Sequence, residues 1–173
     1  HAAYLGELDI LEFYISKDGK IDTIDSDGKT PLHYVFKYRS SLSESEIDVS
    51  IKKAELLLAH NADINAKDKQ GKMPIHYAAV SNCIEYVEFL INTEKVDINA
   101  VDINAKDKDG KTPLHYAATN GNHEMIKFLI EEVADVNAKD NKGYTPLYNA
   151  VEHCSKKDSA NVLAGIRHLI KAG

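Results

Sequence analysis

Residues 109–118 read DGKTPLHYAA, and close variants of this phrase occur three more times, as DGKTPLHYV from Asp27, QGKMPIHYAA from Gln70 and KGYTPLYNA from Lys142. Its Asp, Gly and Thr-Pro are residues of a tight turn followed by a helix start, with Thr as N-cap and Pro in the first helical position. The four prolines lie at positions 31, 74, 113 and 146, which gives spacings of 43, 39 and 33 residues. Internal repetition of this length is typical of stacked repeat proteins.

A second phrase alternates with the first: KKAELLLAHNADINA from Lys52, IEYVEFLINTEKVDINA from Ile84 and HEMIKFLIEEVADVNA from His123. Its apolar residues recur at helical spacing, so each copy predicts a second helix. Gly6, Asn82 and Gly121 stand between the two helices and are expected to end the first one in the left-handed conformation. One unit is therefore a turn, a short helix and a second helix.

The Thr-Pro-Leu-His of residues 30–33 and 112–115, and its variants at 73–76 and 145–148, resemble the signature of ankyrin repeats. The resemblance implies an all-α solenoid of paired antiparallel helices with β-hairpin fingers, in which the motif histidine ties its own turn to the next one. We expect a single domain, residues 1–173. It comprises a partial repeat at about 1–24 and repeats at 25–67, 68–106, 107–139 and 140–173, because AAYLGELDILEFYI from Ala2 matches a second-helix phrase.

Three of these repeats are longer than the 33-residue unit. RSSLSESEID, residues 39–48, predicts a second helix lengthened at its start, with Ser43 and Glu46 as a capping box. About seven extra residues lie around CSKKDSAN, from Cys154. VDINAVDINA, residues 96–105, repeats five residues, and one copy is expected to lengthen a finger. Two interpretations stay open: a neutral duplication, tolerated because longer loops cost little closure entropy, or a finger that reaches a partner.

The composition, with 43% apolar and 28% charged residues in 173, is that of one soluble globular domain. A net charge of −6 argues against general binding of nucleic acid, which needs a dense basic surface. No apolar run approaches the length of a membrane span, so we expect no membrane insertion. Only Cys83 and Cys154 occur, and no Asn-x-Ser/Thr site is present, which favours an intracellular compartment, cytoplasmic rather than nuclear. Secretion into a host cell is a second prediction, since the Lys/Asp-rich fingers resemble those of effectors of intracellular bacteria.

Phosphate and calcium motifs fail on their spacing. GKT begins at Gly28 and Gly110, but a phosphate-binding loop needs a glycine five residues earlier, where Thr23 and Ala105 stand. A calcium loop around KDKDGK would place Ala105 and Tyr116 at its first and twelfth positions. We therefore expect no cofactor.

The histidines and cysteines do not form a metal-binding set. His33, His76 and His115 recur with the repeat, and a zinc site needs at least three suitable ligands. No catalytic group is predicted, and the chain is not expected to be an enzyme. In the last repeat Tyr148, Asn149 and His168 suit an end unit with a wettable surface. A site that includes His153 and His168 is the alternative.

The fingertips and the ends of the first helices remain, since the repeat does not dictate their residue types. By resemblance, this is the face on which ankyrin repeats bind partners, and Tyr38 and Tyr144 are the favoured anchors. The predicted protein-binding residues are Ser26, Asp27, Lys29, Lys37, Tyr38, Lys69, Gln70, Lys72, Val80, Ser81, Lys108, Asp109, Lys111, Thr119, Asn120, Asn141, Lys142, Tyr144, Glu152 and His153.

Charge is unevenly distributed over each unit. Lysines outnumber acidic residues in the second, third and fourth fingers, whereas acidic residues gather on the second helices (Glu7, Asp9, Glu12, Glu44, Glu46, Glu55, Glu85, Glu88, Glu131 and Glu132). A partner with an acidic patch would be steered toward the fingers. The sequence thus predicts a non-catalytic, monomeric protein-binding module of a larger chain. The alternative is a rigid spacer or a regulatory scaffold within a larger enzyme or membrane protein.

Overall fold

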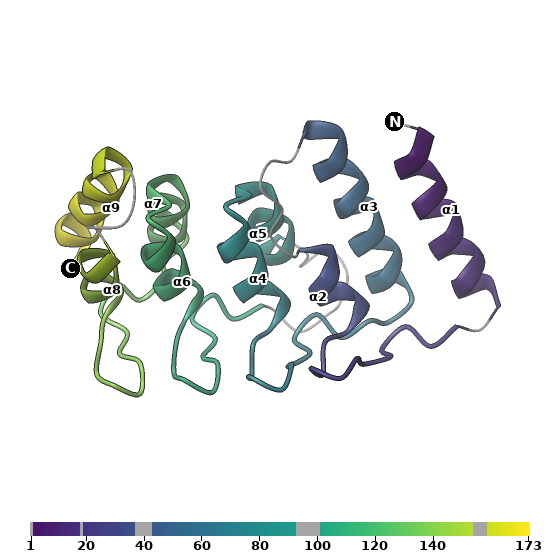
Figure 1. Ribbon diagram of the computed structural model, residues 1–173, viewed down its shortest axis with the longest axis horizontal. Helices are drawn as coiled ribbons and strands as arrows, with labels where there is room; N and C mark the ends of the chain where they lie inside the picture. The colour runs from purple at the N-terminus through teal and green to yellow at the C-terminus, as the bar shows by residue number, and fades with distance from the viewer. Residues whose placement is uncertain (1, 18, 37–42, 93–100, 154–158) are drawn as a thin grey trace.

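The computed structural model describes residues 2–17, 19–36, 43–92, 101–153 and 159–173 (Figure 1). These ranges hold helices and turns and no strand, which confirms the predicted all-α stack. The helices are α1 (Ala2–Ser16), α2 (Pro31–Val35), α3 (Glu44–Ala59), α4 (Pro74–Ser81), α5 (Ile84–Ile91), α6 (Pro113–Asn120), α7 (His123–Glu131), α8 (Pro146–His153) and α9 (Ser159–Ala172).

The helices form two rows. The first helices α2, α4, α6 and α8 contact one another in sequence order, and the second helices α1, α3, α5, α7 and α9 do the same. Each first helix also packs on the second helix that follows it, so every unit joins the two rows. The turns between units project from one side of the stack as a line of fingers (Figure 1).

The predicted signals at the helix ends are mostly confirmed. Thr30 and Thr112 are extended N-cap residues, each followed by proline in the first turn. Asn82 and Gly121 take the left-handed conformation, with φ of 58° and 69°. The prediction for Gly6 is wrong, because α1 continues through it without a break. An interior glycine costs a helix only about 1 kcal/mol relative to alanine, which the packing of α1 on α3 outweighs.

Small and branched side chains fill the space between the rows. Ala78 and Ala117, at the middle of α4 and α6, are fully buried, and their small size lets the adjacent helices approach closely. Val87 and Ile126 from the second helices are likewise inaccessible to solvent. The core is therefore one continuous layer along the stack rather than a separate centre in each unit.

The first long repeat has the predicted longer helix. Helix α3 has 16 residues, twice the 8 residues of α5. Its start is the expected capping box, in which the Ser43 N–H donates to Glu46 Oε2 at 2.8 Å. The extra residues of the last repeat lie largely at 154–158, outside the described residues.

The second VDINA copy, residues 101–105, takes the place that ADINA and ADVNA take in the neighbouring units. Asn104 N–H donates to Asp102 Oδ1 at 2.8 Å, as Asn65 does to Asp63 and Asn137 to Asp135, each at 2.9 Å. The tip of the finger that follows has the standard length, since Asp107 N–H reaches the Lys111 carbonyl at 3.0 Å just as Asp68 N–H reaches that of Lys72. The lengthening predicted from the other copy stays a prediction. The first copy, residues 96–100, precedes this segment and lies outside the described residues.

Candidate protein-binding surface

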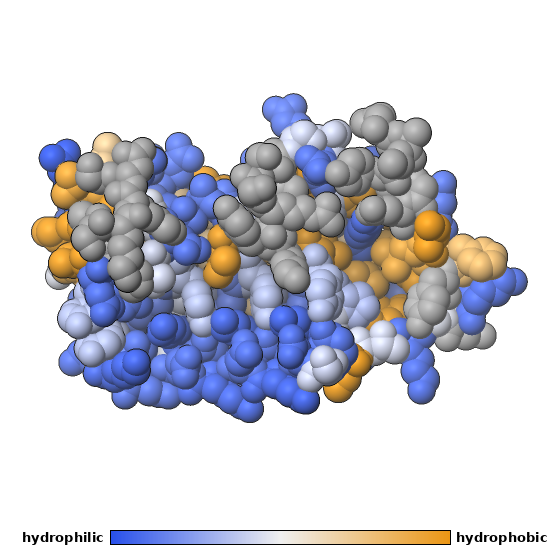
Figure 2. Space-filling view, viewed as in Figure 1, coloured by the Kyte–Doolittle hydropathy of each residue, from blue (hydrophilic) through white to orange (hydrophobic). Residues whose placement is uncertain are grey.

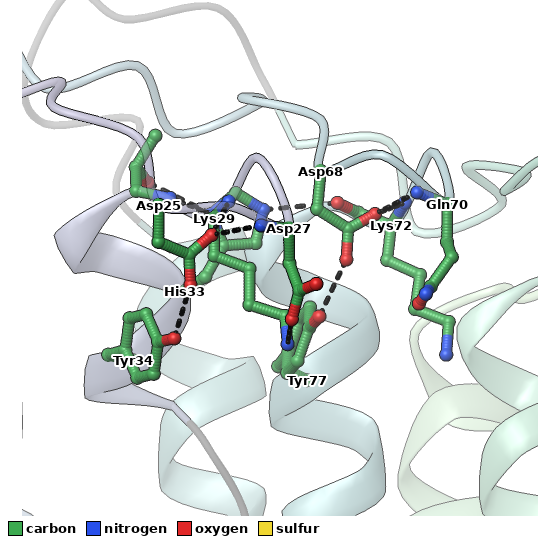
Figure 3. Close-up of polar contacts among 10 residues, drawn as sticks. Asp25, Asp27, Lys29, His33, Tyr34, Asp68, Gln70, Lys72 and Tyr77 are labelled. Atoms are coloured by element: carbon green, nitrogen blue, oxygen red, sulfur yellow. Dashed lines mark hydrogen bonds and ion pairs between the residues drawn. The ribbon is translucent and has the colours of Figure 1, made fainter.

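An aspartate organises each finger from within. Asp68 Oδ1 accepts the N–H groups of Gln70 at 2.8 Å and Lys72 at 2.9 Å, and its Oδ2 accepts the Tyr77 hydroxyl at 2.6 Å (Figure 3). One carboxylate thereby fixes the turn and joins it to the first helix of the same unit. Asp25 with Tyr34 and Asp107 with Tyr116 repeat the full pattern, and Asp140 repeats its two backbone bonds.

These bonds set the charge states of the finger. Burial alone would raise the pKa of Asp68, but the Tyr77 hydroxyl and the N–H groups of Lys72 and Gln70 outweigh it, so the pKa is lowered. Burial, and then the adjacent aspartate, raises the pKa of Tyr77 well above its ordinary value. At neutral pH the pair is therefore a carboxylate that accepts a hydrogen bond from a neutral phenol.

The motif histidines link neighbouring units. His33 Nδ1 accepts the Thr30 N–H at 3.0 Å, so the proton of the neutral ring lies on Nε2, which donates to the Lys72 carbonyl at 3.0 Å. Burial lowers the pKa of the ring, which keeps it neutral at physiological pH. His76 bonds in the same way to Met73 and Ala105, and His115 to Thr112 and Tyr144.

Backbone hydrogen bonds also join the fingertips directly. Lys69 N–H donates to the Asp27 carbonyl at 2.8 Å, and two further bonds, from Lys108 to Gln70 and from Asn141 to Asp109, measure 2.9 Å. This close approach needs glycine, because a Cβ on Gly71 would lie 2.9 Å from Lys108 N. The fingers thus form one connected row, and a partner that touches two of them meets a fixed spacing.

Most predicted fingertip residues lie on the surface. Figure 2 shows a continuous hydrophilic band along the finger side. The outermost positions of the fingers are exposed; they are Ser26, Asp27, Lys69, Gln70, Lys108, Asp109, Asn141 and Lys142. The residues closer to the first helices are half-buried; they are Lys29, Lys72, Lys111 and Tyr144.

The predicted residues at the helix ends differ among themselves. Glu152 is exposed, whereas Val80, Thr119 and Asn120 are half-buried. Ser81 is buried, so its prediction as an exposed residue is wrong: its hydroxyl donates to the Ala78 carbonyl at 2.7 Å and turns inward. Lys37, Tyr38 and the side chain of His153 lie outside the described residues.

The end of the last unit differs from the wettable surface predicted for it. Asn149 is buried, whereas Tyr148, Val151 and Ile170 are exposed. In the preceding unit, Ala118 at the position of Val151 is covered by the next helices, and Ile130 at the position of Ile170 is partly covered. Tyr148 stacks on Tyr144, with ring centroids 4.0 Å apart and planes 15° from parallel. The polar substitution at position 149 therefore lies in the interior of the unit and not on its outer surface.

Three tyrosines were missed at the level of sequence. Tyr34, Tyr77 and Tyr116 follow the motif histidine directly, and they line the base of the fingers on the side of the half-buried lysines. The ammonium groups of Lys29 and Lys72 lie 5.9 Å and 4.8 Å from the ring centroids of Tyr77 and Tyr116. The signal was the His-Tyr pair of each copy, of which only the histidine was given a role.

The described part of the chain contains no group of three or more His, Cys, Asp or Glu side chains arranged to hold a metal ion. None of its helices combines the length and the hydrophobicity needed to cross a bilayer.

Comparison with known proteins gives two matches. A family model for ankyrin repeats, three copies long, matches residues 1–102 and 98–171. An ankyrin repeat protein of Rickettsia bellii is 32% identical over 96 residues, which are 56% of this chain and 48% of that relative. The matched segment thus spans about half the length of this relative.

Proposed function

Since this chain belongs to the ankyrin repeat family, we propose that it is a non-catalytic module that binds a protein partner along its fingers and first helices. Ankyrin repeats are generally protein-binding and non-catalytic. The observation that carries the proposal is the line of exposed fingertips held at fixed spacing by backbone bonds between adjacent fingers. A surface that is ordered before binding loses little conformational entropy on association.

The charge of this surface supports a partner with an acidic patch. In the second finger Lys67, Lys69 and Lys72 surround Asp68, whose carboxylate is buried and already accepts three hydrogen bonds. The lysines therefore dominate what a partner meets there. The first finger differs, because Lys29 forms an ion pair with Asp27 at 3.1 Å. We propose that the second to fourth fingers make the principal contact.

Partner capture with charge-reversed variants tests the proposal. The test variant carries Lys69→Glu, Lys72→Glu, Lys108→Glu and Lys111→Glu. The matched control carries Lys52→Glu, Lys127→Glu, Arg167→Glu and Lys171→Glu, four exposed cations of the second helices, so both variants have the same net charge. Circular dichroism first establishes that both fold, and proteins captured from lysate are identified by mass spectrometry and titrated as pure components.

A partner that binds the wild type and the control but not the finger variant supports the proposal. Equal binding by all three proteins would move the contact to another face, and no specific partner would favour the spacer or scaffold role. An intracellular location belongs to the same proposal, and a fluorescent fusion of the full-length protein tests it.

A further inference from the structure

We propose that an extended acidic segment of the protein partner lies along the half-buried lysines at the finger bases and contacts the exposed fingertip lysines only weakly. The surface in question, the tyrosine–lysine row, consists of Lys29, Tyr77, Lys72, Tyr116 and Lys111. This inference rests on the proposed function and names the chemistry of the partner segment and the residues that hold it.

Tyr116 is the centre of the row. Lys72 Nζ lies 4.8 Å from the centroid of its ring and Lys111 Nζ 5.9 Å, so two fingers direct their ammonium groups to one aromatic side chain. The ring itself cannot turn freely, because its hydroxyl donates to Asp107 Oδ2 at 2.5 Å and the edge of His76 packs against it at a centroid distance of 6.0 Å. Both ammonium groups therefore lie within the distance of a cation–π contact with a ring that is itself held in place.

The two ammonium groups at Tyr116 lack a carboxylate partner in the described part of the chain, where neither lies within 4.0 Å of an acidic oxygen. Lys29, one unit earlier, differs because it pairs with Asp27 and lies beside Tyr77 (Figure 3). Two like charges held near one ring repel each other, and a carboxylate placed between them would relieve that repulsion. The Lys72–Lys111 pair is therefore the position in the row most suited to a glutamate or aspartate side chain.

The Lys72–Lys111 pair differs from the fingertip lysines in how freely its side chains can move. Lys69 and Lys108, from the same two fingers, are exposed, whereas Lys72 and Lys111 are half-buried against tyrosine. A fully exposed lysine loses most of its rotamer freedom when it forms an ion pair, and a lysine already held on a ring loses less. Per charge, the inner pair should contribute more to affinity than the outer pair.

The chemistry of the row favours a polypeptide over a nucleic acid. Single-stranded nucleic acids bind by stacking bases on free aromatic faces, but lysine ammonium groups lie over the rings of Tyr77 and Tyr116, and the hydroxyl groups of both tyrosines are bonded. The buried carboxylates of Asp68 and Asp107 lie beneath the row, and the whole chain carries a net charge of −6. The net charge of the chain repels a dense polyphosphate more strongly than it repels an extended peptide with widely spaced carboxylates.

A fluorescein-labelled peptide of six Glu-Gly units is a suitable probe, with fluorescence anisotropy measured at 20 mM and 150 mM salt. The row variant is Lys72→Met with Lys111→Met, and its control is Lys69→Met with Lys108→Met, which removes the same charges from the same fingers. We expect the row variant to weaken binding about five- to tenfold and the control about twofold or less, since an exposed ion pair at the lower end of the usual range, about 0.2 kcal/mol, contributes only about a 1.4-fold effect. Should the row variant unfold, Lys72→Gln with Lys111→Gln replaces it.

Three results would overturn the inference: equal losses in the two variants, a larger loss in the control, or failure of the wild type to bind the peptide at low salt. Labelled oligothymidylate of twelve nucleotides serves as a second probe. If it binds the wild type more tightly than the peptide does, the choice of a peptide partner over a nucleic acid is also overturned. The proposed function is separable from this outcome. A protein that is captured through the fingers while the peptide fails to bind would retain the binding module and reject only the row.

Discussion

Replacement of the fingertip glycines by alanine should separate the cost of a backbone conformation from the cost of contact between fingers. Gly110 and Gly143 have nearly the same positive φ, 77° and 81°, but differ in their surroundings. A Cβ on Gly110 would lie 2.8 Å from the backbone nitrogen of Asn141, whereas a Cβ on Gly143 would have no atom within 4 Å. The two substitutions therefore share one cost and differ in the other.

The shared cost is about 1–2 kcal/mol for a side chain in the left-handed region, offset by about 0.4–1 kcal/mol from the less flexible unfolded chain. Gly143→Ala should thus lower the free energy of unfolding by about 1 kcal/mol or less. Gly110→Ala also pushes the adjacent finger away and so weakens the bonds of Asn141 to Asp109, 2.9 Å, and to Lys108, 2.8 Å. At about 0.5–1.5 kcal/mol for each bond, the total becomes about 1–4 kcal/mol.

Urea unfolding followed by far-ultraviolet circular dichroism measures both variants against the wild type. Leu169→Ala tests whether the last unit unfolds together with the rest of the stack. Leu169 is buried in α9, and its replacement by alanine should lower the free energy of unfolding by about 2–5 kcal/mol only if the two unfold together. Equal costs for Gly110→Ala and Gly143→Ala, with a normal result for Leu169→Ala, would refute the argument that contact between fingers requires glycine.

Three further predictions concern the histidines, the tyrosines and the duplicated segment. Burial lowers the pKa of His33, His76 and His115, so the unfolded chain takes up protons near pH 6.5 before the folded chain does. The urea concentration at the unfolding midpoint should therefore decrease as the pH is lowered from 7.5 to 5.5, and this decrease should be smaller in His115→Gln. An unchanged drop in that variant would exclude His115 as a source of the pH dependence. Tyr116→Phe should lower the free energy of unfolding by about 1–3 kcal/mol through loss of the bond to the Asp107 carboxylate, and Tyr34→Phe by less because Tyr34 is exposed; equal effects would contradict this. Deletion of residues 101–105, which yields the same protein as deletion of 96–100, should shift the melting temperature by only a few degrees, and a loss of cooperative unfolding would show that both copies are needed in the core.

The architecture could be predicted from the sequence because each unit carries its own local signals. Thr30 and Thr112 before proline, Asn82 and Gly121 at the helix ends, and Ser43 with Glu46 all act within a few residues of the chain. Such signals do not depend on the rest of the fold. Gly6 is the exception, because the packing of helix α1 as a whole overrode the preference of this one residue for a helix end.

The candidate surface was harder to predict because it depends on contacts between units. The carboxylate of Asp68 looks like an exposed fingertip charge in the sequence, but it is buried and bonded to Tyr77, nine residues further on. The Lys72–Tyr116 contact joins two repeats, and neither phrase alone indicates it. Ser81 was expected to be exposed because it lies at the end of a first helix, but a bond to its own helix compensates for its burial. Repeat alignment predicts which positions are equivalent, and the distances across a junction must come from the structure.

The backbone bonds between fingertips all run in one direction, from an N–H in the later finger to a carbonyl in the earlier one. The stack therefore has a polarity, and each junction joins two chemically different edges. A unit taken from the middle can be inserted, copied or removed whole, because both of its edges match any junction. Reversed in orientation, the same unit would bring donor to donor and acceptor to acceptor. Recombination and engineering of this protein are consequently restricted to in-register exchange of units in the same orientation.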